Sequence, residues 1–154
     1  MHLPKLVFIA LFIFVNVPGG AVLAADAQEV VRQITVYKSP TCRCCAKWVK
    51  HMRDQGFFVV SENRRDMRPI KQQYGIEGPL QSCHTAIVDD YVIEGHVPAS
   101  DVKRMLREKP QIAGLTAPGM PQKSPGMQAE GLPPQGYDVL SFDSEGNTSV
   151  YRRY

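Results

Sequence analysis

Three of the four cysteines in this 154-residue chain lie within four consecutive positions. They are Cys42, Cys44 and Cys45. A β-like run at 34–37 precedes them, and a segment with helical spacing at 44–55 begins among them. The positive end of a helix dipole and the guanidinium of Arg43 both favour thiolate over thiol. Because thiolates attack disulfides and bind soft metal ions, the cluster predicts one of these two chemistries.

Two interpretations of the cluster remain open. Cys42 and Cys45 have the CxxC spacing, which at a helix start suits a redox disulfide or a shared metal ion. Cys44 argues against the redox interpretation, since a third thiolate beside a catalytic disulfide invites scrambling. A remote Cys83-His84 pair would raise the set to four sulfurs, and bridging sulfurs could hold more than one ion. We therefore favour a metal site, with a thiol–disulfide oxidoreductase using Cys42 and Cys45 as the alternative.

The remaining donor residues favour copper over zinc. Thiolate and thioether ligands select Cu(I), whereas three cysteines and a histidine would also suit zinc. Met120 and Met127 each follow a Pro-Gly pair, and zinc seldom takes a thioether; a role in covering the core is equally open for both. His84 is the best histidine candidate because it adjoins Cys83, while His96 either reaches the site or caps a helix. His51 lies two helical turns beyond Cys44 and is expected at the surface.

The elements that must position these residues follow the order β-α-β-α-β-β-α. Strands are predicted at 34–37, 57–60, 85–88 and 91–94, and helices at 44–55, 66–74 and 98–109. Thr41 can cap the first helix. Met52, Met67 and Met105 are predicted core residues, and the apolar run 57–60 is predicted to be covered on both faces. A parallel pair, a hairpin and a closing helix form an α/β, thioredoxin-like fold. In that fold the loop before the third strand packs against the reactive cysteines, which predicts Cys83 and His84 beside them.

The two ends of the chain differ from this central region. Residues 110–136 contain six Pro and five Gly, which predicts an irregular loop, and 137–154 predict a C-terminal β-hairpin around a turn at 143–147. Residues 1–24 have the apolar run and small-residue cleavage site of a secretory signal peptide, too short to span a bilayer. We therefore expect one mature domain, 25–154, in the periplasm, with no membrane span after cleavage. A net charge of +3 without long basic runs does not suggest nucleic acid, and no hydrolase motif is present.

Three blocks of the sequence together resemble the CopG-type copper-resistance proteins, a family of exported, thioredoxin-like metal-binding proteins. The blocks are 37–48, 82–86 and 91–99. The resemblance implies Cu(I) bound by bridging cysteines as a multi-copper cluster, and a role in periplasmic copper handling. The sequence does not identify the partner that delivers or takes the copper, for which another periplasmic copper-handling protein is the candidate. Carried onto this chain, the implied ligands are Cys42, Cys44, Cys45, Cys83, Met120 and Met127, with His84 and His96 as further candidates. The resemblance favours a binding protein over an enzyme, although copper redox activity at the cluster is compatible with it.

Overall fold

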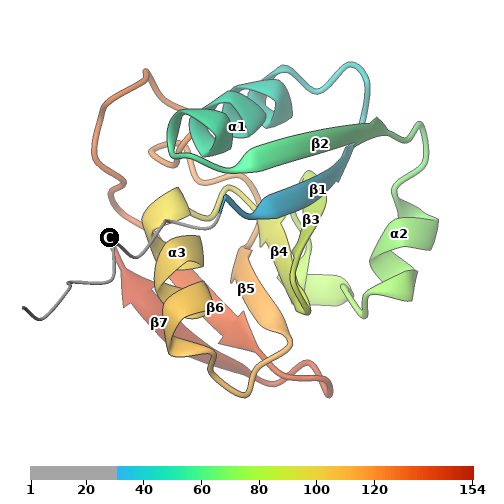
Figure 1. Ribbon diagram of the computed structural model, residues 1–154. Helices are drawn as coiled ribbons and strands as arrows, with labels where there is room; N and C mark the ends of the chain where they lie inside the picture. The colour runs from blue at the N-terminus through green and yellow to red at the C-terminus, as the bar shows by residue number, and fades with distance from the viewer. Residues whose placement is uncertain (1–30) are drawn as a thin grey trace, which may run out of the picture.

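A seven-stranded mixed sheet organises residues 31–154, the part of the chain that the computed structural model describes (Figure 1). The strands are β1 (Gln33–Lys38), β2 (Phe58–Asn63), β3 (His84–Val88), β4 (Tyr91–Gly95), β5 (Gly114–Ala117), β6 (Asp138–Phe142) and β7 (Thr148–Arg153). The helices are α1 (Arg43–Asp54), α2 (Arg68–Gln73) and α3 (Ala99–Glu108), with a 3-10 turn, η1, at Gly78–Leu80. The strand order in the sheet is β2-β1-β3-β4-β5-β6-β7. The predicted signal peptide lies outside the described residues.

The first four strands and the three helices confirm the predicted mixed α/β class and the order β-α-β-α-β-β-α. β1 pairs in parallel with β2, to which it is connected through α1, and antiparallel with β3. β3 forms a hairpin with β4. In this register Lys38, the last residue of β1, lies opposite His84, the first residue of β3. The segment that carries the three cysteines therefore leaves the sheet beside the loop that carries Cys83.

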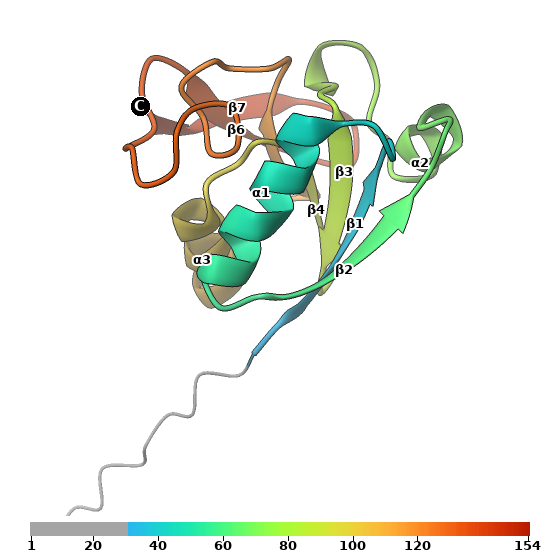
Figure 2. The same ribbon diagram turned by 90° about the horizontal axis from the view of Figure 1, so that it is seen from above.

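Apolar side chains cover the two faces of the sheet in separate clusters. α1 and α3 lie on one face, and α2 lies on the other (Figure 2). The first cluster contains Trp48 and Met52 from α1 and Met105 from α3. The second, smaller cluster contains Ile76 and Leu80, which follow α2. Met52 and Met105 are fully buried, as predicted. The prediction is wrong for the third methionine, Met67, which lies at the N-cap of α2 and is only partly buried.

The prediction of an irregular loop over 110–136 is wrong for its first part, because β5 lies within it. β5 pairs in parallel with β4 and antiparallel with β6, and all four of its residues are buried. A Cβ at Gly114 would overlap the carbonyl oxygen of Val92, so a glycine is what allows β5 to lie against β4. Residues 118–136 contain no helix or named strand, and β6 and β7 form the predicted C-terminal hairpin.

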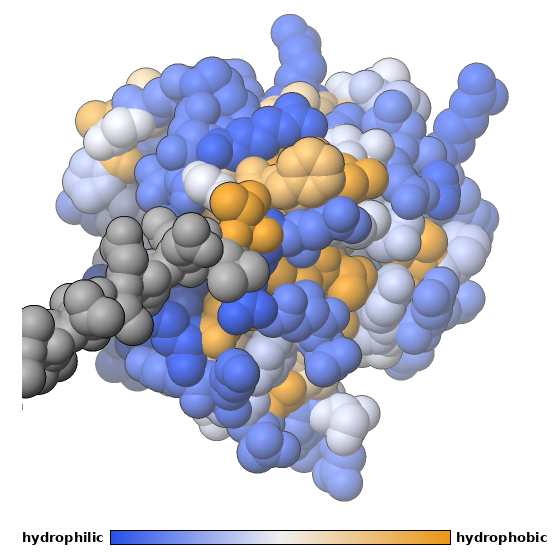
Figure 3. All heavy atoms as spheres, in the orientation of Figure 1, coloured by the Kyte–Doolittle hydropathy of each residue, from blue (hydrophilic) through white to orange (hydrophobic). Residues whose placement is uncertain are grey.

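The surface corrects a second expectation. The run 57–60 is not covered on both faces, because Phe58 is 58% exposed while its neighbour Val59 is buried. β2 is also an edge strand of the sheet. On the face shown in Figure 3, apolar side chains form small patches among hydrophilic atoms. The exposed large apolar residues within 31–154 are Val31, Phe58, Met120, Leu132 and Val150. None of the helices in this described range is long and apolar enough to cross a bilayer.

His51 is half-buried rather than fully at the surface, and it caps α3. Its Nε2 accepts a hydrogen bond from the backbone N–H of Ala99 at 3.2 Å. Burial lowers the pKa of His51 below its ordinary value, so the folded chain binds a proton here less readily than the unfolded chain. The stabilisation of the fold by neutral His51 is therefore complete above the pKa of the unfolded chain, about 6.5. It is lost as the pH falls from that value through the lower pKa of the folded chain.

Replacing His51 with glutamine should flatten this pH dependence, since an amide oxygen can accept from Ala99 at every pH. Between pH 7 and pH 5 the free energy of unfolding of the unaltered chain should fall by about 1 kcal/mol more than that of His51→Gln, the usual size of a lost helix cap. Urea unfolding of both metal-free proteins at each pH measures the difference, in which the contributions of the other histidines cancel. Parallel pH curves would contradict the role of His51.

Candidate metal centre

The first turn of α1 presents the three clustered cysteines. The backbone N–H of Cys42 donates to the carbonyl of Ser39 at 3.2 Å, and this turn sets the direction of the helix. Cys42 is the N-cap: its sulfur accepts from the backbone N–H of Cys45 at 3.3 Å. The prediction that Thr41 caps the helix is therefore wrong. Because Cys42 itself performs the capping, its sulfur is held over the helix end next to the sulfurs that follow.

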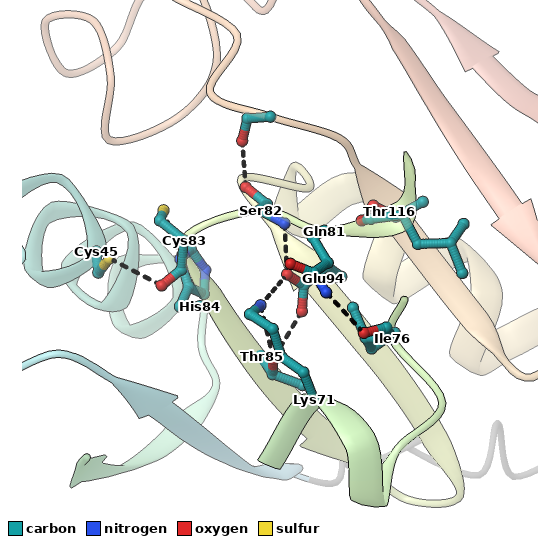
Figure 4. A network of polar contacts seen from close by, with 12 residues as sticks. Cys45, Lys71, Ile76, Gln81, Ser82, Cys83, His84, Thr85, Glu94 and Thr116 are labelled. Carbon is teal, nitrogen blue, oxygen red and sulfur yellow. Dashed lines mark hydrogen bonds and ion pairs between the residues drawn. The ribbon is translucent and has the colours of Figure 1, made fainter. Parts of the chain in front are cut away.

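The structure brings all four cysteines together, as predicted. Ligand atoms of Cys42, Cys44, Cys45 and Cys83 all lie within 4.8 Å of one another. Cys42 and Cys45 form a disulfide, and the sulfur of Cys44 lies 3.4 Å from that of Cys42. Cys83 comes from the loop before β3, and its backbone carbonyl lies 3.9 Å from the sulfur of Cys45 (Figure 4). The four sulfurs thus offer either one disulfide with two free thiols or, after reduction, four thiols.

Two imidazoles lie beside Cys83 and form a second donor group that shares its sulfur. His96 Nε2 lies 3.1 Å from Cys83 Sγ, and His84 Nδ1 lies 3.4 Å from it. His96 Nδ1 lies 2.7 Å from the carbonyl oxygen of Pro125, which can only accept, so Nδ1 carries the hydrogen. In this tautomer the lone pair of Nε2 faces Cys83, which is how a metal-binding histidine is usually oriented by its second nitrogen.

His84 is enclosed more tightly than His96. Its ring is fully buried, 4.5 Å from the ring of Trp48 and 5.0 Å from that of His96 between centroids. Trp48 is held in turn by a 2.9 Å hydrogen bond from its Nε1 to the carbonyl of Val97. These contacts fix His84 at the start of β3, with Nδ1 toward the sulfur of Cys83.

Burial controls the protonation of this group. It raises the pKa of Cys83 to about 12, with the neighbouring Cys44 adding to the shift. Burial also lowers the pKa of His96, and it lowers that of His84 well below the ordinary value, with the neighbouring His96 ring contributing. In the metal-free chain Cys83 is therefore a thiol and both imidazoles are neutral. A metal ion at Cys83 has to displace a proton there, whereas the imidazoles are ready to donate lone pairs.

The two methionine-bearing turns flank the cysteines on separate sides. Gly119, just before Met120, forms an isolated parallel bridge with Ser82, next to Cys83. Gly126, just before Met127, packs on the first turn of α1. The side chain of Met120 is 55% exposed and that of Met127 is half-buried. The structure thus places both segments beside the site, while coordination by either thioether remains a prediction.

Gly126 has a positive φ of 85°, and a Cβ there would lie 2.8 Å from the backbone nitrogen of Trp48. Gly126→Ala should therefore lift the turn off α1 and break the contact between His96 and Pro125. Gly131 is a matched control, since its φ is 80° and a Cβ there meets nothing within 4 Å. Gly131→Ala should cost about 1–2 kcal/mol of unfolding free energy for the left-handed backbone alone. Gly126→Ala should cost at least about 1 kcal/mol more in urea unfolding, and equal losses would show that the packing is unimportant.

A buried ion pair near the site was not among the residues that sequence reasoning selected. Glu94 in β4 and Lys71 in α2 pair beneath the loop that carries Cys83 (Figure 4). The available signal was a glutamate inside a strand whose other side chains are apolar or aromatic, Tyr91–Gly95. A charge in a central strand is expected to have a buried partner.

Comparisons with known proteins bear on the identity of this site. A family model described as "Protein of unknown function, DUF411" matches residues 80–127, which include Cys83, both candidate histidines and both candidate methionines. The solved structure "Copper resistance protein copG- Form 2" is 37% identical with a TM-score of 0.73, covering 80% of this chain and 98% of that chain. "Copper resistance protein copG- Form 1" is 38% identical with a TM-score of 0.72, covering 79% and 96%. No curated protein matches the chain. Since the similarity extends over nearly the whole of both solved structures, the chain belongs to the CopG family of copper resistance proteins.

Proposed function

We propose that this chain is a periplasmic copper-binding protein that holds Cu(I) through Cys42, Cys44, Cys45 and Cys83. The ions are bound as a multi-copper cluster, in copper resistance or homeostasis, by sequestration or redox buffering. The observation that carries the proposal is the gathering of four sulfurs from two separate chain segments within 4.8 Å. The two solved relatives, both named as copper resistance proteins, support the choice of metal.

The donor set has the chemistry that Cu(I) prefers. Thiolates are soft ligands, and sulfurs this close to one another can bridge neighbouring ions. His96 and His84 add nitrogen donors next to Cys83. The turns that precede Met120 and Met127 adjoin Ser82 and α1, and on this proposal the two thioethers complete the shell. Zinc would use the cysteines and histidines but gives no reason for the methionines.

Copper binding requires the reduced chain. Two of the four sulfurs are joined in the Cys42–Cys45 disulfide and cannot act as thiolate ligands in that state. A dithiol reductant would reduce this disulfide to two thiols by supplying two electrons and two protons, and would itself be oxidised to a disulfide. On this proposal residues 1–24 are cleaved, and the mature protein is one domain over 25–154. A second periplasmic copper-handling protein delivers or removes the ion.

Metal stoichiometry tests the proposal. The reduced mature chain is titrated anaerobically with Cu(I) against a competing chelator, and the titration is repeated with Zn(II) and with Cys83→Ser. We expect more than one tightly held Cu(I), weaker binding by Cys83→Ser, and preference for Cu(I) over Zn(II). Failure of the unaltered chain to retain Cu(I) would overturn the proposal.

The second candidate is a thiol–disulfide oxidoreductase, and the disulfide between Cys42 and Cys45 is the observation that favours it. That function needs a disulfide that cycles with a substrate and depends on these two cysteines alone. Insulin reduction by the mature chain with a thiol reductant measures the cycle. Turnover that survives removal of both Cys44 and Cys83 would favour the enzyme over the copper protein.

A further inference from the structure

The inference concerns the buried polar network beneath the loop that carries Cys83. The carboxylate of Glu94 is fully buried and is surrounded by three donors. Lys71 Nζ pairs with Oε1, the backbone N–H of Ser82 donates to the same oxygen at 2.6 Å, and Thr85 Oγ1 donates to Oε2 at 2.6 Å. Lys71 Nζ also lies 3.4 Å from Thr85 Oγ1. Figure 4 shows Glu94 at the centre of these contacts, with Cys83 and His84 adjoining them.

Stability alone does not account for this network, so a role in positioning other residues is the better explanation. A buried ion pair contributes little net stability compared with apolar residues of similar volume. Three of its members already belong to regular elements: Lys71 to α2, Thr85 to β3 and Glu94 to β4. Ser82 is the exception, because it lies in the connecting loop and is joined to the network through its backbone N–H. The network therefore ties this one loop residue to three fixed elements.

A second, independent feature fixes the same residue. Gly95 follows Glu94 and has a positive φ of 72°. A Cβ at Gly95 would lie 2.5 Å from the Cβ of Ser82 and would overlap its hydroxyl, so only glycine leaves room for Ser82. The Ser82 hydroxyl in turn donates to the carbonyl of Gly119, and the Gly119 N–H donates to the carbonyl of Gln81 at 2.9 Å.

Ser82 is thus the point where the strand β4, the Cys83 loop and the turn before Met120 meet. We propose that Glu94 is the positioning residue of the candidate metal centre: by accepting the Ser82 N–H it sets the place of Cys83 against Cys44 and His96, and it holds the turn that precedes Met120. Lys71 balances the charge of this acceptor, and Thr85 orients it. The effect on copper rests on the proposed function, whereas the effect on Cys83 does not.

Two double variants separate the acceptor from the charge. Lys71→Met/Glu94→Leu removes the acceptor and leaves no unpaired buried charge, a replacement that proteins often tolerate without loss of stability. Lys71→Met/Glu94→Gln also removes both charges but keeps an amide oxygen for Ser82. Glu62→Gln, on β2, controls for the loss of an acidic side chain elsewhere.

The rate at which Cys83 is alkylated in the metal-free mature chain measures how well the loop holds this side chain in place. With the Cys42–Cys45 disulfide formed, Cys44 and Cys83 are the two free thiols, and mass spectrometry after iodoacetamide follows each. We expect Cys83 to react at least about tenfold faster in Lys71→Met/Glu94→Leu, since the released loop exposes it. The rate should stay within about threefold of the unaltered chain in Lys71→Met/Glu94→Gln and in Glu62→Gln, and Cys44 should stay within about twofold throughout.

Several results would overturn the proposal. They are an unchanged Cys83 rate in the leucine variant, an equal rise in the glutamine variant, or a parallel rise at Cys44, which would mean general loosening. Hydrogen exchange of the unaltered protein gives a test that needs no variant: the Ser82 amide should exchange at least about a hundredfold slower than an unprotected amide. Exchange at the unprotected rate would show that Glu94 does not hold it.

The copper titration completes the test. The leucine variant should bind Cu(I) at least about tenfold more weakly than the unaltered chain, the range expected for a residue that orients a ligand, and the glutamine variant should not. If the unaltered chain retains no Cu(I), the proposed function fails while alkylation and exchange still decide the role of Glu94. If copper binds and the leucine variant retains full affinity, the positioning role at the metal centre fails alone.

Discussion

Replacing Cys44 with serine is expected to lower the affinity of the reduced chain for Cu(I) by more than about 100-fold while leaving the Cys42–Cys45 disulfide able to form. Loss of a residue that merely orients a ligand costs about 10–100-fold, and loss of the ligand itself should exceed that range. Cys44 takes no part in the disulfide, yet its sulfur lies 3.4 Å from that of Cys42. Its contribution to the proposed function is therefore that of a free thiolate.

Competition with a Cu(I) chelator under anaerobic conditions measures the affinity, and thiol counting after oxidation shows whether the disulfide forms. Thr41→Ser is the matched control, a small change on the same turn that removes no sulfur. Undiminished Cu(I) affinity in Cys44→Ser would contradict the cluster, and it would leave the oxidoreductase interpretation as the better account of the CxxC pair.

Trp48→Ala should have the largest effect on stability. The side chain is fully buried between α1 and the sheet, and its Nε1 donates to the carbonyl of Val97. Removing a buried tryptophan costs about 3–5 kcal/mol through lost burial and the cavity left behind. That is a large share of the total stability of a domain of this size, about 5–15 kcal/mol.

Trp48→Phe divides this loss into its parts, because it keeps most of the ring and removes the donor. The carbonyl of Val97 would then lack its partner, which costs about 1–3 kcal/mol. Urea unfolding of both variants gives the two values, and Phe58→Ala serves as the control because Phe58 is exposed. A loss in Trp48→Ala no larger than in Phe58→Ala would show that the core does not depend on this residue.

Local sequence patterns predict the four strands and three α-helices from β1 to α3. Most of them have helical periodicity or a short apolar run rich in β-branched and aromatic residues, while α2 is marked by Pro69 in its first turn and Gly75 after its end. The buried side chains of α1, for example, recur at three- and four-residue steps, and Gly56 ends the helix with a positive φ. β5 was missed because Gly114–Ala117 is short and lies in a segment whose composition is dominated by Pro and Gly. Its strand conformation comes from pairing with β4 and β6, which are distant in sequence. The apolar run of β2 predicts cover on both faces, and its composition does not reveal that the face carrying Phe58 is left exposed.

The site was predictable as far as it depends on topology. Once Cys83 is placed before the third strand, it must approach the start of α1, and His84 follows. The sequence favours Thr41 as the helix cap because threonine is the more usual capping residue, whereas the turn at Ser39 puts the Cys42 sulfur over the helix end. The sequence leaves open whether His96 is a ligand or a cap, since the orientation of its ring depends on Pro125, 29 positions later. The role of Glu94 depends on one backbone N–H, for which a sequence carries no signal.

The approach of Cys83 to the first turn of α1 also affects the stability that a shared metal ion would give to the fold. The two segments are 38 positions apart, measured from Cys45 to Cys83. An ion shared by their sulfurs would act as a cross-link, and closing a loop of this length restricts the unfolded chain by about 4 kcal/mol in the chain-entropy account. On the proposed function, the thermal stability of the protein would therefore rise with the amount of copper bound. Its melting temperature would then report copper loading, even in an extract where the metal itself is not assayed.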